Sequence, residues 1–218
     1  MTIHFLSGQG ADEKLFENLV LPPGFSANYV QWIEPLEKER FSSYIKRIVE
    51  QINTTEDFIL IGVSLGGIVA VELSKFLRPR LTIIISSIAT AKELPPHFRL
   101  INFFKIQKIA PGGLYKWYNY FVNWYFGTTN KREKELLRYY MKSATRKYMK
   151  WSTNKVLTWK NKERPANLLH IHGTADRIFP HQFTHADVKI KNGTHFMVHN
   201  KAEEIGKIIT EKLNAISA

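Results

Sequence analysis

The sequence predicts an α/β protein: a mostly parallel sheet of about six strands with helices on both faces, plus a helical insertion. Three observations support this fold class. Short apolar stretches typical of strands alternate with amphipathic stretches typical of helices. A G-x-S-x-G pentapeptide stands between one such strand and the helix after it. The alternation stops between residues 92 and 163 and then resumes. The length of 218 residues suits one domain with an insertion.

The alternating elements can be placed in order along the chain. Strands are predicted at residues 3–6, 27–33, 58–63, 81–86, 168–171 and 188–190. Helices are predicted at 12–19, 41–52, 66–76 and 201–216. Asp12 is the expected N-cap of the first helix, with Glu13 in its first turn. Strands that alternate with helices in this way form a parallel sheet, because each helix returns the chain to the end of the sheet at which the previous strand began.

The pentapeptide GVSLG at 62–66 carries the most specific signal in the chain. The apolar stretch FILI at 58–61 precedes it, and GIVAVEL at 67–73 begins a helix. This context predicts a nucleophile elbow, a tight turn that strains the backbone of Ser64 and exposes its hydroxyl above the sheet. The N–H groups at the start of the helix would then face an oxyanion beside Ser64. The less specific interpretation, a Gly/Ser turn, leaves the next two residues unexplained.

Two further residues complete the set that acyl transfer needs. Asp176 follows the strand at 168–171, and His195 lies between the strand at 188–190 and the last helix. Catalytic groups of open α/β sheets gather at the carboxyl ends of the strands. The order Ser64, Asp176, His195 therefore predicts a catalytic triad. His199 is the alternative base, and Asp187 is the weaker alternative acid because it stands at the start of a strand.

These motifs together resemble the α/β-hydrolase superfamily of serine hydrolases. The resemblance rests on four stretches: GVSLGG at 62–67, HGTAD at 172–176 followed by Pro180, GTHF at 193–196, and SGQG at 7–10. Relatives commonly have His-Gly where this chain has Ser7 and Gly8. Their oxyanion donor in this loop is a backbone N–H, which corresponds here to Gln9. The six predicted strands are fewer than the usual eight, which implies a minimal α/β-hydrolase core.

The chemistry of the triad assigns a role to each residue. Ser64 Oγ is a poor nucleophile until a base takes its proton, and His195 is the candidate base. Asp176 would orient the imidazole and stabilise the imidazolium. The backbone N–H groups of Leu65 and Gln9 would form the oxyanion hole. The predicted activity is hydrolysis of a carboxylic ester or thioester through an acyl-enzyme on Ser64.

Several alternatives to this activity stay open. The enzyme could be a thioesterase or esterase whose acyl group is carried on coenzyme A or on a carrier protein. A lyase could use the same triad for proton transfer without an acyl-enzyme, and the fold does not choose between these reactions. A ligand-binding module that keeps the triad but turns over slowly belongs to another functional class.

The insertion at 92–163 is predicted to be a basic, aromatic-rich cap of three or four helices over the active site. The flanking segments, 1–91 and 164–218, would form the hydrolase core. Sixteen of the 28 aromatic residues lie in the insertion, spaced as on helices, so most of them should hold the cap together. Some are expected to line an apolar substrate pocket; the candidates are Trp117, Phe121, Trp124 and Tyr125.

All of the net charge of +12 comes from this insertion. Of 31 Lys and Arg and 19 Asp and Glu, the insertion holds 16 and 4, which leaves 15 of each for the core. The basic residues could simply keep exposed helices solvated. They could also attract an acidic substrate or partner, such as coenzyme A or an acidic acyl carrier, or an anionic membrane surface. Nucleic acid is the least favoured partner because no recognised binding motif accompanies them.

Composition limits the remaining possibilities. The chain has no cysteine, which excludes disulfides, thiolate metal sites and a cysteine nucleophile. His170 and His172 alternate on one strand, but no third ligand stands near at metal spacing. They are therefore interpreted as packing or hydrogen-bonding residues, and no metal or cofactor is expected. The N-terminal stretch lacks signal-peptide features, and no apolar run is long enough to span a membrane, so a cytoplasmic protein is expected.

Overall fold

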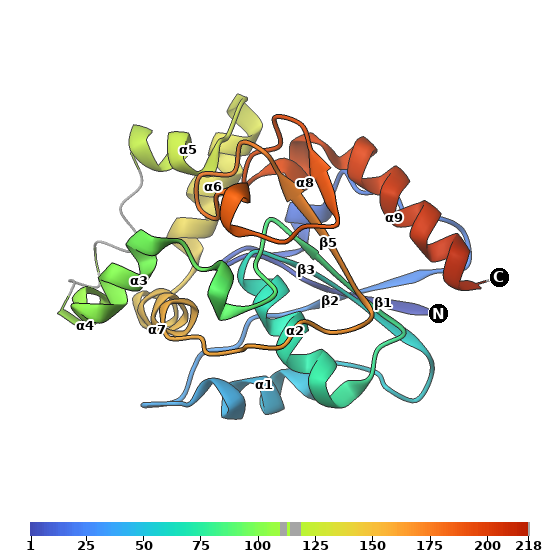
Figure 1. The fold of residues 1–218 in the computed structure, drawn as a ribbon, viewed down its shortest axis with the longest axis horizontal. Helices are drawn as coiled ribbons and strands as arrows, with labels where there is room; N and C mark the ends of the chain where they lie inside the picture. Colours follow the sequence, from blue (N-terminus) through green and yellow to red (C-terminus); the bar gives the residue numbers. More distant parts are fainter. Residues whose placement is uncertain (110–112, 114–118, 218) are drawn as a thin grey trace.

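The structure is a computed structural model and describes residues 1–109, 113 and 119–217. At its centre is a six-stranded sheet in which all paired strands are parallel (Figure 1). The strands lie in the order β2-β1-β3-β4-β5-β6. They are β1 (Thr2–Leu6), β2 (Ser26–Val30), β3 (Phe58–Val63), β4 (Leu81–Ile85), β5 (Leu168–Gly173) and β6 (Val188–Ile190). The predicted fold class and the parallel sheet are confirmed.

Helices cover both faces of this sheet. Those of the core are α1 (Phe41–Val49), α2 (Leu65–Leu77), α8 (Met197–Asn200) and α9 (Ala202–Ser217), with short 3-10 helices η1 (Glu13–Phe16) and η4 (His181–Phe183). Between β4 and β5 lie η2 (Ala91–Glu93), α3 (Pro96–Phe103), α4 (Ile106–Ile109), α5 (Tyr120–Phe126), α6 (Lys131–Ser143) and α7 (Arg146–Leu157). Over the ranges that the structure describes, no helix is both long and apolar enough to cross a bilayer.

The alternation of side chains along β3 shows how the sheet joins two hydrophobic layers. All six residues of β3 are buried, as expected of a central parallel strand with both faces covered. Ile59 and Ile61 belong to the cluster that contains Ile209 of α9. Leu60, which points to the other face, belongs to the cluster that contains Val69 of α2. The sheet is therefore enclosed between α9 on one side and α1 and α2 on the other.

Three elements are shorter by at least two residues than the sequence predicts, and one of them is α1, which ends at Val49 and not at residue 52. Instead of a helix over 12–19 there is only the 3-10 helix η1, although Asp12 is its N-cap and accepts the N–H of Lys14 at 3.1 Å. Tertiary contacts end it, because the Asn18 side chain donates to the backbone oxygen of His199 at 3.1 Å. Strand β2 stops at Val30, before the predicted end at residue 33. The local pattern gave no sign of these long-range contacts.

The insertion contains five α-helices in its described part, one or two more than the three or four expected. Side chains at the N-caps mark the starts of three of them: Asn119 for α5, Asn130 for α6 and Thr145 for α7 each accept a backbone N–H of the first turn. Gly127 ends α5 in the left-handed conformation, with φ 73°. The helices thus begin and end at the polar and glycine breaks visible in the sequence.

Candidate active site

Ser64 lies at a sharp turn between β3 and α2. Its backbone has φ 54° and ψ −117°, a conformation that is strained for a residue with a Cβ. Two hydrogen bonds hold the turn: the Ser64 N–H donates to Ile85 O at 3.0 Å, and Ser87 Oγ donates to Ser64 O at 2.7 Å. A Cβ on Gly66 would lie 2.0 Å from Leu6 O, so the start of α2 packs directly on the end of β1. A nucleophile elbow requires this kind of strained turn and close packing between a strand and a helix.

The three predicted triad residues lie side by side. His195 Nε2 is 2.9 Å from Ser64 Oγ, and His195 Nδ1 is 2.8 Å from Asp176 Oδ2. Asp176 and His195 are buried, and Ser64 is partly exposed. The second carboxylate oxygen, Oδ1, accepts the backbone N–H groups of Ile178 at 2.8 Å and Phe179 at 3.0 Å. The carboxylate is therefore held at both oxygens, with Oδ2 directed toward His195.

The charge state of Asp176 follows from its neighbours. Burial by itself would raise the pKa of this carboxyl group, but the adjacent His195, His172 and the Phe179 N–H hold the pKa below its usual value. An ionised Asp176 can only accept a hydrogen bond, so the proton between the two residues lies on His195 Nδ1. Nε2 of the neutral ring then has a free lone pair, which faces the Ser64 hydroxyl.

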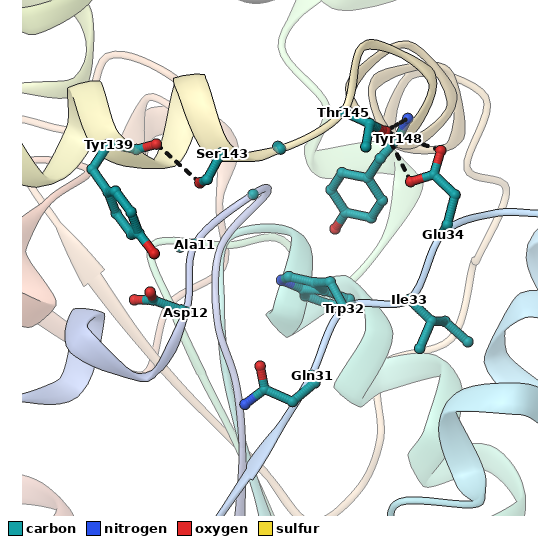
Figure 2. A pocket seen from close by; sticks show the side chains of 12 residues that line it. Ala11, Asp12, Gln31, Trp32, Ile33, Glu34, Tyr139, Ser143, Thr145 and Tyr148 are labelled. Carbon is teal, nitrogen blue, oxygen red and sulfur yellow. Dashed lines mark hydrogen bonds between the residues drawn. The ribbon is translucent and has the colours of Figure 1, made fainter.

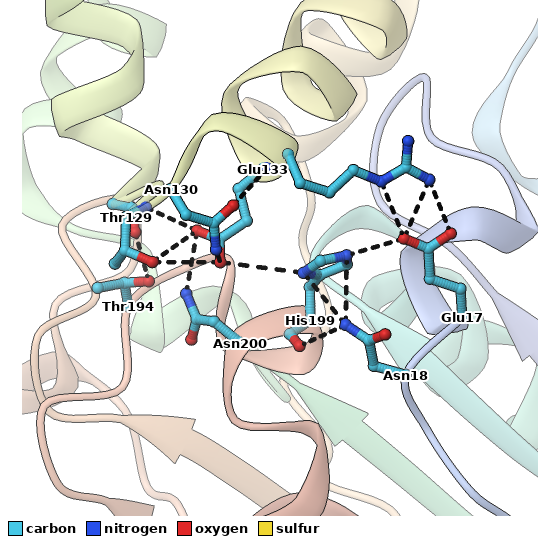
Figure 3. Close-up of polar contacts among 10 residues, drawn as sticks. Glu17, Asn18, Thr129, Asn130, Glu133, Thr194, His199 and Asn200 are labelled. Carbon is cyan, nitrogen blue, oxygen red and sulfur yellow. Dashed lines mark hydrogen bonds and ion pairs between the residues drawn. The ribbon is translucent and has the colours of Figure 1, made fainter.

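The alternative base, His199, lies in a different environment. It belongs to a polar network that joins α8, η1 and α6 (Figure 3). Its Nε2 is 3.1 Å from Glu17 Oε1, and its Nδ1 is 3.9 Å from Glu133 Oε1. Glu133 is fully buried and accepts hydrogen bonds from Thr129 and Asn130 at the start of α6. His199 therefore links the insertion to the core.

The alternative acid, Asp187, forms contacts that connect two parts of the sheet. Its carboxylate accepts the backbone N–H of His170 at 2.7 Å and pairs with Arg164. It thereby joins the chain before β6 to β5. No contact links it to His195.

The two predicted oxyanion donors are positioned by different means. Leu65 is the first residue of α2, so its N–H has no partner within the helix. Gln9 is held by its side chain, whose Nε2 lies within 3.0 Å of Met149 O, Ser152 Oγ and Thr153 Oγ1 on α7. A loop of the core is thus tethered to the insertion next to Ser64.

Ser7, where relatives commonly have histidine, closes the same loop. Its Oγ donates to Ala11 O at 2.7 Å and accepts the Trp32 Nε1–H at 3.0 Å. The Trp32 ring nitrogen also lies 3.0 Å from Gly8 O. These bonds fix the loop 7–11 on its outer side and draw residues 31–32 away from the ladder of β2.

A buried histidine pair lies behind Asp176. His172 Nε2 is 2.7 Å from Phe179 O, and His172 Nδ1 is 3.2 Å from His170 Nε2. A carbonyl oxygen only accepts, so His172 carries its proton on Nε2 and accepts from His170 at Nδ1. The same Nε2 is 3.6 Å from Asp176 Oδ2. The prediction that this pair forms hydrogen bonds is confirmed. No feature of the sequence indicated that the pair also supports Asp176.

Burial of this pair makes a prediction about pH and stability. Burial lowers the pKa of both His170 and His172 from the ordinary histidine value of about 6.5. Below that pH the unfolded chain binds more protons than the folded protein. The free energy of unfolding should therefore fall as the pH falls from about 6.5 toward the folded pKa values, by up to about 1.4 kcal/mol per pH unit for each histidine. Urea unfolding between about pH 8 and pH 5 measures this slope.

The variant His170→Gln isolates the contribution of one ring. Gln does not titrate but can still donate a hydrogen bond toward His172. The change in the free energy of unfolding per pH unit should decrease by about the contribution of one histidine. A slope equal to that of the unchanged protein would contradict the assignment.

Two phenylalanines that the sequence analysis did not single out contact His195. The rings of Phe126 and Phe179 meet the imidazole edge-on, with centroids 5.6 Å and 5.8 Å away. Phe179 lies three residues after Asp176 in the loop that follows β5, so its position in the sequence could have indicated that it lies near the site. Phe126 comes from α5, and only the tertiary structure brings it to the site.

The predicted pocket residues are distributed differently. Trp117 lies outside the described residues. Phe121 and Trp124 are exposed, by 62% and 47%, and point out from α5. Tyr125 is half-buried, and burial together with the charge of Asp176 raises its pKa to about 12. Of the three described candidates, Tyr125 is the one placed within electrostatic reach of Asp176.

The structure also contains an open pocket of about 320 Å³ on the outer side of the Gln9 loop (Figure 2). Its lining comes from three places: residues 10–12, residues 31–34, and the end of α6 with the turn and first residues of α7 that follow it. Neither Ser64 nor His195 is among the residues described as lining it. This pocket borders the candidate active site but does not contain it.

No protein-family model matches the chain, and no curated protein matches it in sequence. Solved structures do match. A thermophilic esterase from Thermogutta terrifontis has a TM-score of 0.70 at 15% identity, over 100% of this chain and 91% of that one. MenH from S. aureus has a TM-score of 0.68 at 15% identity, over 100% and 95%. ClbQ from the colibactin NRPS/PKS pathway has 0.62 at 14%, over 99% and 98%. Together with the parallel sheet, these matches show that the chain has the α/β-hydrolase fold.

Proposed function

We propose that this protein is a serine hydrolase that cleaves a carboxylic ester or thioester through an acyl-enzyme on Ser64. The observation that carries the proposal is the hydrogen-bonded chain from Ser64 Oγ through His195 to Asp176, with contacts of 2.9 and 2.8 Å. The strained turn at Ser64 supports it, because such strain persists where the surrounding structure enforces a functional geometry.

The reaction follows from this geometry. His195 Nε2 takes the Ser64 hydroxyl proton as Oγ attacks the carbonyl carbon. The carbonyl oxygen becomes an oxyanion, which accepts hydrogen bonds from the N–H groups of Leu65 and Gln9. When the intermediate collapses, the bond to the leaving group breaks, and the leaving group takes the proton from His195. Water then attacks the acyl-enzyme by the same steps, releasing the acid and restoring Ser64.

Asp176 and its surroundings keep His195 in the required state. The carboxylate holds the proton on Nδ1 and stabilises the imidazolium that forms during each step. Two backbone N–H groups and His172 keep the carboxylate ionised and oriented. The rings of Phe126 and Phe179 limit the access of water to the imidazole.

We further propose that residues 92–163 act as a cap on the core formed by 1–91 and 164–218. Three contacts support this role. Gln9 binds α7, Thr194 Oγ1 donates to Gly127 O at 2.9 Å, and Arg177 Nη1 donates to Trp124 O at 2.7 Å. All three core residues lie next to or within the loops that carry the oxyanion and triad groups, so movement of the cap would alter the site.

The alternatives differ in the acyl carrier and in the chemistry. The basic cap favours an anionic carrier, either coenzyme A or an acidic acyl carrier protein. The similar structures include an esterase and a protein of an NRPS/PKS pathway. A lyase or a slow binding module would retain the same triad geometry.

A fluorophosphonate label tests the proposal. The unchanged protein should be labelled covalently at Ser64, and Ser64→Ala should not be labelled, because only an activated serine attacks phosphorus. Comparing p-nitrophenyl esters with acyl-coenzyme A substrates then separates a plain esterase from a thioesterase. Failure to label Ser64 under conditions that label a reference hydrolase would favour the binding module.

A further inference from the structure

Residues 94–132 of the cap contain no Asp or Glu. This 39-residue segment does contain six Lys and Arg and eleven aromatic residues. It combines the two properties that suit an anionic lipid surface: positive charge and aromatic rings.

The described part of this segment exposes many of its large apolar side chains. On α3 and α4, Leu100 is 58% exposed, Phe103 76%, Phe104 60% and Ile106 44%. The basic residues Arg99 and Lys105, also exposed, stand among them. A folded protein rarely leaves neighbouring large apolar side chains in water unless that surface has a partner.

Helix α5 exposes a second group of the same kind. Tyr120 is 85% exposed, Phe121 62% and Trp124 47%. The hydroxyl of Tyr125 lies 3.4 Å from His97 Nε2, which connects α5 to the start of α3. Figure 1 shows α3, α4 and α5 on one side of the molecule, away from α9 and the chain termini. We define the exposed apolar residues of α3, α4 and α5 as the aromatic face.

The elements that carry the aromatic face also place aromatic rings at the candidate active site. Phe121 stacks on Tyr125 with centroids 6.0 Å apart and an interplanar angle of 9°. Phe126, the next residue in α5, contacts the His195 ring. From α3, Phe98 contacts Phe179 at 6.0 Å, and Phe179 contacts His195. Both α3 and α5 therefore present exposed rings to solvent and carry other rings that lie at or next to the candidate base.

We infer that the aromatic face docks on an anionic lipid bilayer and that the enzyme takes its ester substrate from that surface. The statement about substrate rests on the proposed function, whereas docking does not. The apolar side chains would enter the boundary between headgroups and acyl chains, and Arg99 and Lys105 would pair with lipid phosphates. The absence of carboxylates from 94–132 removes repulsion from the headgroups. Because α3 and α5 also carry Phe98 and Phe126, docking would place the lipid surface against helices that contact the candidate active site.

Flotation with lipid vesicles tests the docking directly. The full-length protein should float with vesicles that contain phosphatidylglycerol and much less with pure phosphatidylcholine, and added salt should weaken its binding. The double variant Phe103→Ser/Phe104→Ser should reduce the partition onto anionic vesicles by about tenfold or more, because two exposed rings no longer enter the bilayer. The matched control is Phe76→Ser, which removes a 51% exposed ring from α2 and should bind as the unchanged protein does.

A second measurement separates docking from catalysis. Without vesicles, the double variant should hydrolyse a short soluble p-nitrophenyl ester at the normal rate and keep its Tm, because both rings are exposed. With the ester embedded in anionic vesicles, its rate should fall in parallel with its binding. If the protein floats but hydrolyses neither ester, the docking stands and the proposed function fails.

Three results would overturn the inference. The first is that the unchanged protein stays in solution with anionic vesicles. The second is that the double variant and the Phe76→Ser control bind vesicles equally. The third is that the unchanged protein does not bind vesicles but binds an acidic acyl carrier protein through the same face.

Discussion

Replacing Ser64 by Ala should abolish ester hydrolysis and leave the fold intact. The Oγ atom forms the bond to the acyl group, and no other described group stands in its place beside His195 Nε2. Removing the base or its orienting acid should also be severe. His195→Ala and Asp176→Asn should each lower kcat by about 10⁴, as in other triads of this geometry. The three losses should not add, because the residues act as a unit. Steady-state kinetics with a good ester substrate measures these effects.

The matched control for the base is His199→Ala. His199 is buried to a similar degree and stands four residues from His195, but it contacts Glu17 and not Ser64. This variant should lose stability and keep most of its kcat. The opposite result, with His195→Ala near normal turnover and His199→Ala inactive, would reassign the base.

The second large effect is expected from Gly66→Ala. The added Cβ would lie 2.0 Å from Leu6 O and 2.4 Å from Ser7 O, and both are backbone atoms that cannot rotate away. Helix α2 would have to move off β1, which shifts both Ser64 and the loop of Gln9. We expect a loss of about 3 kcal/mol or more in the free energy of unfolding, an effect at the high end for single substitutions. The Tm should fall by roughly 6 to 12 °C for a chain of this size, and kcat should fall with it.

Gly206→Ala in α9 provides the control. There the nearest atoms to a new Cβ are Leu19 Cδ1 at 3.6 Å and Val20 O at 3.7 Å, which are ordinary contacts. Ala in a helix interior is favoured over Gly by roughly 0.5 to 1 kcal/mol, so Tm should stay the same or rise. Equal Tm values for the two variants would show that the elbow tolerates a side chain and that its packing is looser than the structure describes.

Much of the core could be predicted because its signals are local. The strand at 58–63 was predicted with its full extent, because the apolar run FILI leads directly into the G-x-S-x-G turn, a pattern typical of a buried parallel strand. The helix after Ser64 was predicted within one residue at each end. The elements that differ are those with long-range partners. Residues 12–19 form only one 3-10 turn, because Asn18 is held by His199 far along the chain.

The sequence by itself determined the fold class, the order of the six strands along the chain, and the identity of Ser64, Asp176 and His195 as candidates. Periodicity and turn residues act over a few positions, so they can be read without coordinates. Only the tertiary structure decided that His195 and not His199 faces Ser64, since both follow the same strand. It also decided that His172 supports Asp176, that Phe126 reaches the site and that Phe121 and Trp124 face outward. These outcomes depend on side-chain direction and on contacts between distant segments, which are set when the helices pack against the sheet.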